Sequence, residues 1–416
     1  MNHPCTSALS KKENHLFTQP RKLPTGLVWL FAIASGLSVA NVYYAQPLLD
    51  AIAQDLAIRY ATVGSVILVT QIGCAVALLL LVPLGDRMDR RRLMRLQLLA
   101  LVAALIAVSI TKTVLGLFAA MFAVGMLGTA MTQGLITYAA SIAEPHERGY
   151  VVGTAQSGVF IGLLLARVFA GAISDLAGWR SVYFCAALLM LMIALPLWKS
   201  LPMVANSNHQ LSYPRLILSM LTLVSKNKLL QIRGILALLM FAVFNIFWSA
   251  LALLLSAPPY HYSHTAIGAL GLVGVLGALM ASKVGQWADQ GFAQRTSGFA
   301  LLLILLSWIA FAQIEYSIAA LILGILLLDL GGQALHVTNQ SMILQIQQDN
   351  QGRLVGLYML FYAAGSGLGA ISTTMTYAKA GWLGVCLLGG CISVIALSFW
   401  WITRNAQHDI ELLEGN

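Results

Sequence analysis

Long apolar runs, separated by short polar segments, occupy most of this chain. A helix needs about 20 apolar residues to cross a bilayer. The runs are too long for barrel strands and show no strict alternation, so helices are expected. We therefore predict an all-α polytopic membrane protein with twelve transmembrane helices. The runs cover residues 26–48, 60–83, 93–111, 114–140, 151–174, 181–200, 232–257, 264–285, 295–313, 317–343, 354–378 and 380–403.

Composition excludes the other classes of protein. Of the 416 residues, 59% are hydrophobic and only 9% are charged, whereas a soluble domain carries about 25% charged residues. The five cysteines show no metal-binding spacing, so neither a metal site nor a disulfide framework is expected. The net charge of +9 lies in loops between apolar runs, which argues against nucleic-acid binding. Without a nucleotide loop, catalytic triad or metal cluster, we expect no enzyme, no cofactor and no ATP-driven pump.

Basic residues predict the orientation. With a cytoplasmic N-terminus, 19 of the 24 Lys and Arg residues fall on the cytoplasmic side, which places both termini there by the positive-inside rule. The others are Arg59, Lys112, Arg180 and Lys379 outside, and Arg167 within a span. The predicted domains are an N-terminal tail (1–24), a six-helix bundle (25–200), a cytoplasmic linker (201–231), a second six-helix bundle (232–403) and a C-terminal tail (404–416).

An internal repeat relates the two halves at an offset of 203 residues. Its matches are Asp86 with Asp289, Val152-Gly153 with Val355-Gly356, Gly162 with Gly365, and Ala177-Gly178-Trp179 with Ala380-Gly381-Trp382. Each match is weak by itself, but together they favour duplication of a six-helix unit. Parallel repeats of this kind place a substrate site between the halves, near the middle of the membrane.

Twelve spans, a central linker and the loop GDRMDRRRL at 85–93 together resemble the major facilitator superfamily. ANVYYAQPLL at 40–49 and DLGGQALHVTNQ at 329–340 resemble its bacterial sugar- and drug-efflux branch. The resemblance implies two six-helix bundles that rock by alternating access. It also implies a monomer in the bacterial cytoplasmic (inner) membrane that moves a small molecule.

The loop after the second span resembles the superfamily motif G-x-x-x-D-R-x-G-R-R, although Val82 and Asp89 replace its glycines. The resemblance implies a conformational latch on the cytoplasmic side. Arginines that merely anchor the topology are the alternative. The latch candidates are Asp86, Arg87, Arg90, Arg91 and Asp289.

The fifth span carries Arg167 where the antiporters of the superfamily show a Gly-Pro pair. An arginine inside a membrane needs a partner or water. Snorkelling to the outer headgroups is the alternative, because Arg167 lies about 10 Å from the end of its helix.

Asp329 is the one acidic residue deep inside a span. A low-dielectric site favours the neutral form of a carboxyl, which suits proton binding and release. We expect Asp329 to couple protons to transport with Arg167 as its partner; a static ion pair or a cavity-lining charge are the alternatives. His336 lies two turns further along and is a second proton-coupling candidate, or a neutral hydrogen-bonded histidine.

Spans 1, 4, 7 and 10 line the cavity in this superfamily, and amides and aromatic rings there suit an amphipathic small molecule. The tyrosines could instead belong to the interfacial belt. His261 and His264 follow the seventh run, and we interpret them as surface residues. The cavity candidates are Asn41, Tyr44, Gln46, Gln133, Asn245, Trp248, Gln333 and Tyr362.

These features predict a secondary transporter that exports a neutral or anionic small molecule in exchange for protons. An importer or uniporter of the same fold is the first alternative. A non-transporting membrane sensor is the second, and it is disfavoured by the polar cavity and by the absence of a long polar segment.

Overall fold

The computed structural model describes residues 23–85, 88–144, 147–201, 213–275, 287–344 and 351–414, and every regular element in these ranges is a helix. Ten of the described helices are long and apolar enough to cross a membrane. One of them, Gly352–Arg404, is 53 residues long and breaks at Gly381, so it holds two of the predicted spans. Of the predicted eighth span, 264–285, the structure describes the first part as the short apolar helix His264–Gly274, and residues 276–286 lie outside the described ranges.

The first half of the chain folds into six membrane-length segments, several of which are interrupted. Its second span, for example, contains a π-helical turn before a short helix with Pro83. The elements are α1 (Thr25–Tyr43), η1 (Gln46–Leu48), α2 (Leu49–Asp55), α3 (Tyr60–Val63), α4 (Ser65–Val76), η2 (Ala77–Leu81), α5 (Val82–Leu84), α6 (Arg90–Ile110), α7 (Val114–Ile142), α8 (Arg148–Ala177) and α9 (Trp179–Ser200).

The second half follows a linker helix, α10, and contains its own set of long helices. The elements are α10 (Tyr213–Lys226), α11 (Lys228–Ser256), α12 (His264–Ala269), η3 (Leu270–Gly274), η4 (Ala288–Phe292), α14 (Ala293–Phe311), α15 (Ile318–Leu344) and α16 (Gln351–Glu414).

The repeat at an offset of 203 has a structural counterpart. Gly178 ends α8 with φ of 82°, and Gly381 breaks α16 with φ of 59°. Only glycine adopts these positive values without strain, so each glycine lets one span end and the next begin at once. Trp179 and Trp382, the residues that follow, are both buried. The same turn chemistry therefore joins spans 5 and 6 and spans 11 and 12.

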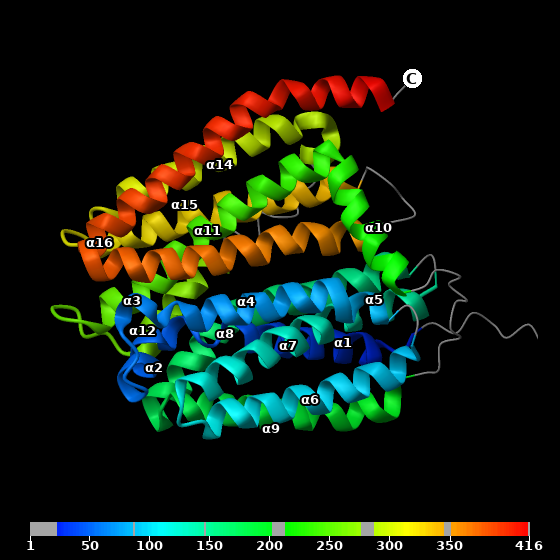
Figure 1. Ribbon diagram of the computed structural model, residues 1–416, viewed down its shortest axis with the longest axis horizontal. Helices are drawn as coiled ribbons and strands as arrows, with labels where there is room; N and C mark the ends of the chain where they lie inside the picture. The colour runs from blue at the N-terminus through cyan, green and yellow to red at the C-terminus, as the bar shows by residue number, and fades with distance from the viewer. Residues whose placement is uncertain are drawn as a thin grey trace, which may run out of the picture.

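The helices form two bundles side by side (Figure 1), blue to green in the first half and green to red in the second. Both ends of the described chain and the linker helix α10 lie at one end of the molecule, which we call the terminal end. The opposite end, which holds α2, α3 and α12, is called the distal end.

The two bundles meet closely at the distal end. A Cβ placed on Gly64, between α3 and α4, would overlap the carbonyl of Ala370 on α16, and one on Gly171 of α8 would overlap the carbonyl of His264. The Thr374 hydroxyl also donates to the carbonyl of Ala61 across this contact, at 3.3 Å. Such backbone-to-backbone approach is typical of small-residue helix contacts in membranes. The structure therefore shows a state whose distal end is closed.

Candidate functional site

A central cavity lies between the two bundles and has two adjoining parts, which share five lining residues. The part beside Arg167 and Asp329 has a volume of about 90 Å³, and the part beside Gln71 and Gln133 has a volume of about 110 Å³. Residues of both bundles line each part. Parallel repeats are expected to form a substrate site at such an interface between the halves. The shared residues are Tyr43, Phe160, Leu163, His336 and Tyr362.

Arg167, on α8, is only 5% exposed and lines this cavity. Its Nε donates a 3.2 Å hydrogen bond to Gln46 Oε1. Its guanidinium lies over the ring of Trp248, 4.1 Å from the centroid. A cation over an indole face is stabilised by the ring quadrupole, more so when water is excluded. Arg167 is therefore held by partners within the protein and does not depend on reaching the headgroups.

Gln46 links Arg167 to the other bundle through hydrogen bonds. Its Nε2 donates to Asn245 Oδ1 at 2.9 Å, and the Asn245 amide in turn donates to the carbonyl of Phe241 at 3.1 Å. Gln46 comes from η1 of the first bundle and Asn245 from α11 of the second. These bonds fix the orientation of the guanidinium relative to both halves.

Asp329, on α15, faces the same cavity and is 6% exposed. A Cβ on Gly274 of η3 would overlap its carboxylate, so the glycine makes room for it. Among the described residues, no hydrogen bond or ion pair within 4.0 Å joins the Asp329 carboxylate to Arg167 or to another side chain. The structure thus brings the two predicted residues to one cavity and leaves the carboxylate open to a proton or a ligand.

His336 lines both parts of the cavity, and its Nδ1 lies 3.0 Å from the Tyr358 hydroxyl. This is the geometry of a buried, hydrogen-bonded histidine. Four of the predicted cavity residues also line the cavity, namely Gln133, Gln333, Asn245 and Tyr362.

Other predicted cavity residues lie elsewhere. Gln46 and Trp248 sit behind Arg167 and hold it. Asn41 donates to the carbonyl of Leu37 within its own helix. Tyr44 faces away from the cavity, packs against the rings of Phe169 and Tyr183, and lines a separate apolar groove between α1 and α8. Its neighbour Tyr43 takes the cavity position, because adjacent residues on a helix face directions about 100° apart.

The predicted latch is only partly visible. Asp86 and Arg87 lie outside the described residues, as does the side chain of Asp289. Arg90 donates from Nε to the carbonyl of Gly85 at 3.0 Å and contacts the carbonyl of Thr137 on α7 at 3.5 Å. Asp89 caps α6 by accepting from the backbone N–H of Arg91, which explains a carboxylate where the motif has glycine. The latch remains a prediction.

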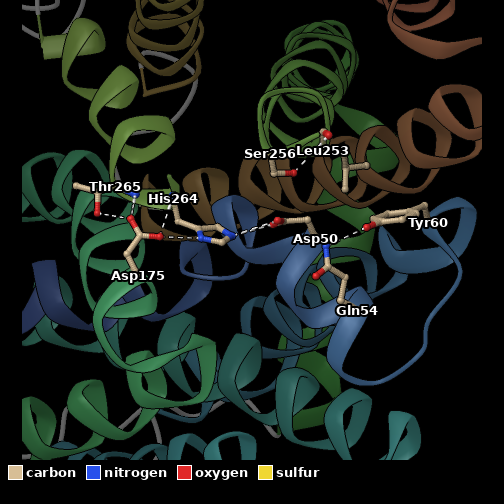
Figure 2. Close-up of polar contacts among 8 residues, drawn as sticks. All are labelled: Asp50, Gln54, Tyr60, Asp175, Leu253, Ser256, His264 and Thr265. Atoms are coloured by element: carbon tan, nitrogen blue, oxygen red, sulfur yellow. Dashed lines mark hydrogen bonds and ion pairs between the residues drawn. The ribbon is translucent and has the colours of Figure 1, made fainter. Parts of the chain in front are cut away.

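Two side chains have surroundings that the sequence did not predict. His264, interpreted as a surface residue, lies between the carboxylates of Asp50 and Asp175 at the distal end (Figure 2). Arg233, counted among the cytoplasmic charges, is 0% exposed and donates to Ser297 at 2.8 Å and to Asn339 at 3.2 Å. Asn339 belongs to the polar string DLGGQALHVTNQ at 329–340, and a polar side chain within a span is a signal that a buried partner lies nearby.

The buried Arg233 gives a prediction about stability. Arg233→Met removes the guanidinium that donates to Ser297 Oγ and Asn339 Oδ1 in the core, so two buried acceptors lose their donor and we expect destabilisation of about 3 kcal/mol. This is measured as a lower midpoint of thermal unfolding in detergent. Arg295→Met, at an exposed position of the neighbouring helix α14, is the control and should leave the midpoint unchanged. Equal effects of the two variants would contradict a structural role for Arg233.

Two bundles of membrane helices around a shared, charged cavity define a membrane transporter. The chain belongs to the Major Facilitator Superfamily, whose sequence profile matches residues 29–346. The predicted fold and family are thus confirmed.

Relatives of this chain carry transporter names. It is 42% identical to "Uncharacterized transporter YgaY" of Escherichia coli O157:H7, over 94% of this chain and 97% of the relative. It is 29% identical to "Probable transporter SCO4007" of Streptomyces coelicolor, over 88% of this chain and 85% of that protein. A "Probable sugar efflux transporter" of Helicobacter pylori is 23% identical over 90% of this chain and 93% of the relative.

Solved structures share the fold. The crystal structure of a mutant of the nucleoside transporter NupG superposes with a TM-score of 0.73 and 15% identity, over 90% of this chain and 99% of that one. At this level of identity the likeness concerns the fold alone.

Proposed function

We propose that this protein exports a small molecule in exchange for protons, with Asp329 as the proton-linked carboxylate. The observation that carries the proposal is a buried carboxylate that lines the cavity between the bundles and accepts no hydrogen bond from the described residues. A lone carboxylate in a low-dielectric site binds a proton readily, and intramembrane acids of this kind mark proton pathways.

Exchange requires the proton and the cargo to compete for one group. A cargo that donates a hydrogen bond to the ionised Asp329 would be displaced when that carboxyl is protonated. Arg167 lines the cavity and bonds Gln46 through Nε only, so its guanidinium would receive an acceptor of the same cargo. A purely anionic cargo held by Arg167 would instead favour protonation of Asp329, and proton and cargo would then move together.

The wall of the cavity narrows the cargo further. Apolar and aromatic side chains supply most of it, including Phe160, Phe241 and Phe244. Such a wall around a few placed polar groups suits an amphipathic or aromatic molecule. We therefore propose as cargo a neutral compound that carries both a hydrogen-bond donor and an acceptor. Export as the direction of transport agrees with the name of one distant relative, a "Probable sugar efflux transporter".

The proposed setting follows from the basic residues. The terminal end would face the cytoplasm of a bacterium, the protein would work as a monomer in the inner membrane, and residues 25–200 and 232–403 would rock about the cavity. The distal end would then face outward, and the latch residues Asp86, Arg87, Arg90, Arg91 and Asp289 would lie at the cytoplasmic end.

The proposal is tested with inside-out vesicles that carry an inward-acid proton gradient and a pH-sensitive dye. A panel of neutral, anionic and cationic compounds is added, with vesicles lacking the protein as the control. Proton exchange predicts that at least one neutral compound dissipates the gradient only when the protein is present. Dissipation by no compound of the panel would remove the basis for proton-coupled export, and acidification on addition would favour the importer.

A further inference from the structure

A histidine and two carboxylates lie together at the distal end, outside the lining of the central cavity and unused by the proposed mechanism. Figure 2 shows His264, the first residue of α12, between Asp175 on α8 and Asp50 on α2. We call these three residues the distal cluster. The carboxylates belong to the first bundle and the histidine to the second, so the cluster spans the interface that closes this end.

Both ring nitrogens of His264 face carboxylate oxygens. Nδ1 lies 2.9 Å from Asp175 Oδ1, and Nε2 lies 3.1 Å from Asp50 Oδ1 and 3.2 Å from Asp50 Oδ2. A neutral imidazole has one donor nitrogen and one acceptor nitrogen, and an ionised carboxylate only accepts. The full set of contacts therefore needs one proton more than a neutral ring with two carboxylates supplies.

The proton is best placed on the imidazole. Asp175 already accepts from the backbone N–H groups of His264 and Thr265 at 3.0 and 2.8 Å and from the Thr265 hydroxyl at 2.6 Å. Hydrogen bonds of this kind stabilise the ionised form of a carboxylate. Asp50 is buried, and a buried carboxylate is costly unless it is paired with a cation. An imidazolium between the two satisfies both.

Other charged groups nearby are occupied elsewhere. Arg180 of α9 forms an ion pair with Asp55 of α2. Arg167 of α8 is held by Gln46 and Trp248, although its backbone packs against Gly268 of α12. Asp50 and Asp175 are the titratable groups that act on the His264 ring, so the charge state of the cluster depends on these three residues.

We propose that the distal cluster is a second proton-binding site, which holds the distal end closed only while it is protonated. Without the proton, a nitrogen lone pair faces a carboxylate across the interface, and only the bonds that Asp175 accepts from the His264 and Thr265 N–H groups and the Thr265 hydroxyl remain there. Closure then weakens and the distal side opens.

This site regulates transport and does not drive it. A proton that enters the cluster from the distal side when that side is open leaves to the same side when it opens again, so it crosses no membrane and does no work. The distal cluster therefore makes the balance between the distally closed and the distally open state depend on the pH of the distal side. Asp329, in the central cavity, is the group that can meet both sides.

The test measures distal opening directly. Spin labels are placed on Leu115→Cys and Tyr316→Cys, two highly exposed distal positions, one in each bundle, in a background without the native cysteines and in lipid nanodiscs. Electron–electron distance measurements then give the ratio of closed to open molecules. Two charge-assisted hydrogen bonds depend on the proton, so we expect this ratio to fall about tenfold or more between about pH 6 and about pH 9.

Variants assign the response to the cluster. His264→Gln keeps a donor but cannot titrate, so the ratio should become independent of pH. His261→Asn, three residues away at an exposed position with positive φ that Asn tolerates, should keep the full response. Asp50→Asn should shift the response to lower pH, and it serves as the second readout if the His264 variant does not fold. A full response in both His264→Gln and Asp50→Asn would overturn the proposal.

The outcome is separable from that of the proposed function. Asp329→Asn should leave the distal pH response intact, because Asp329 lies in the cavity. If no compound dissipates the proton gradient but the distal response is present, proton-coupled export fails and the distal site stands. A pH response abolished by Asp329→Asn would assign the effect to the cavity and overturn the distal site.

Discussion

Asp329→Asn is expected to abolish accumulation of cargo against its gradient while leaving exchange of cargo across the membrane. One proton exchanged per cargo molecule across a gradient of about 2 pH units supports accumulation of about 100-fold, since each unit supplies about 1.4 kcal/mol. An amide has nearly the shape of a carboxylate but takes up no proton, so the ratio should fall to about 1. The measurement is uptake of a labelled cargo into inside-out vesicles, with and without a proton gradient.

Accumulation should be lost while exchange persists because of where the Asp329 carboxylate lies. Asp329 lines the cavity and is not bonded to the described side chains, so its replacement should leave the walls and the rocking of the bundles intact. Counterflow, which needs only binding and rocking, should therefore persist.

Asp55→Asn is the matched control for this substitution. Asp55 lies at the distal end in an ion pair with Arg180, and its side chain is 41% exposed. Surface pairs contribute little, so accumulation should remain near that of the parent protein. Accumulation by Asp329→Asn equal to that of Asp55→Asn would reject the coupling role of Asp329.

Arg167→Ala is expected to weaken cargo binding about 100-fold, because a charge-assisted hydrogen bond inside a closed cavity contributes about 1.5–3 kcal/mol. Arg167→Lys should recover part of this loss. A lysine keeps the charge but lacks the planar group that stacks on Trp248 and bonds Gln46. Binding is measured by calorimetry in detergent with the compound that the vesicle panel identifies.

Arg180 offers a close control for the same chemistry. Its guanidinium lies over Trp179, 4.4 Å from the ring centroid, but outside the cavity. Arg180→Ala thus removes a comparable cation–π contact and should leave the dissociation constant of the cargo unchanged. If both alanine variants bind cargo equally well, Arg167 has a structural role only.

Much of the fold could be predicted because a bilayer allows so few solutions. Backbone groups in lipid must pair within a helix, so long apolar runs define spans almost by length alone. The match of Gly178 with Gly381 in the internal repeat also has a local reason, since the backbone needs a positive φ at both positions. Asp329 and Arg167 were recognisable for the same reason, because a charge inside a span has to be explained.

The surroundings of His264, Arg233 and Tyr44 could not be predicted, because they depend on contacts between distant segments. His264 follows a loop and looks like a surface residue until α8 and α2, from the other bundle, place carboxylates on both sides of its ring. Arg233 lies at the start of a span, where basic residues normally reach water, yet Ser297 and Asn339 enclose it. Tyr44 and Tyr43 are neighbours in the chain, and only the rotation of α1 in its bundle decides which of them faces the cavity.

Two conclusions could be read from the chain alone: it crosses a membrane repeatedly as helices, and two charges, Arg167 and Asp329, stand apart from all the others. Hydropathy and the cost of a buried charge are local properties, so they can be recognised along the chain. Three features became apparent only from the packing of the helices: Gln46 and Trp248 hold Arg167, Asp329 stays open to the cavity, and His264 lies between two carboxylates at the distal interface. These contacts join segments 81 to 214 residues apart, and their partners are set by helix rotation and bundle packing, which no local pattern records.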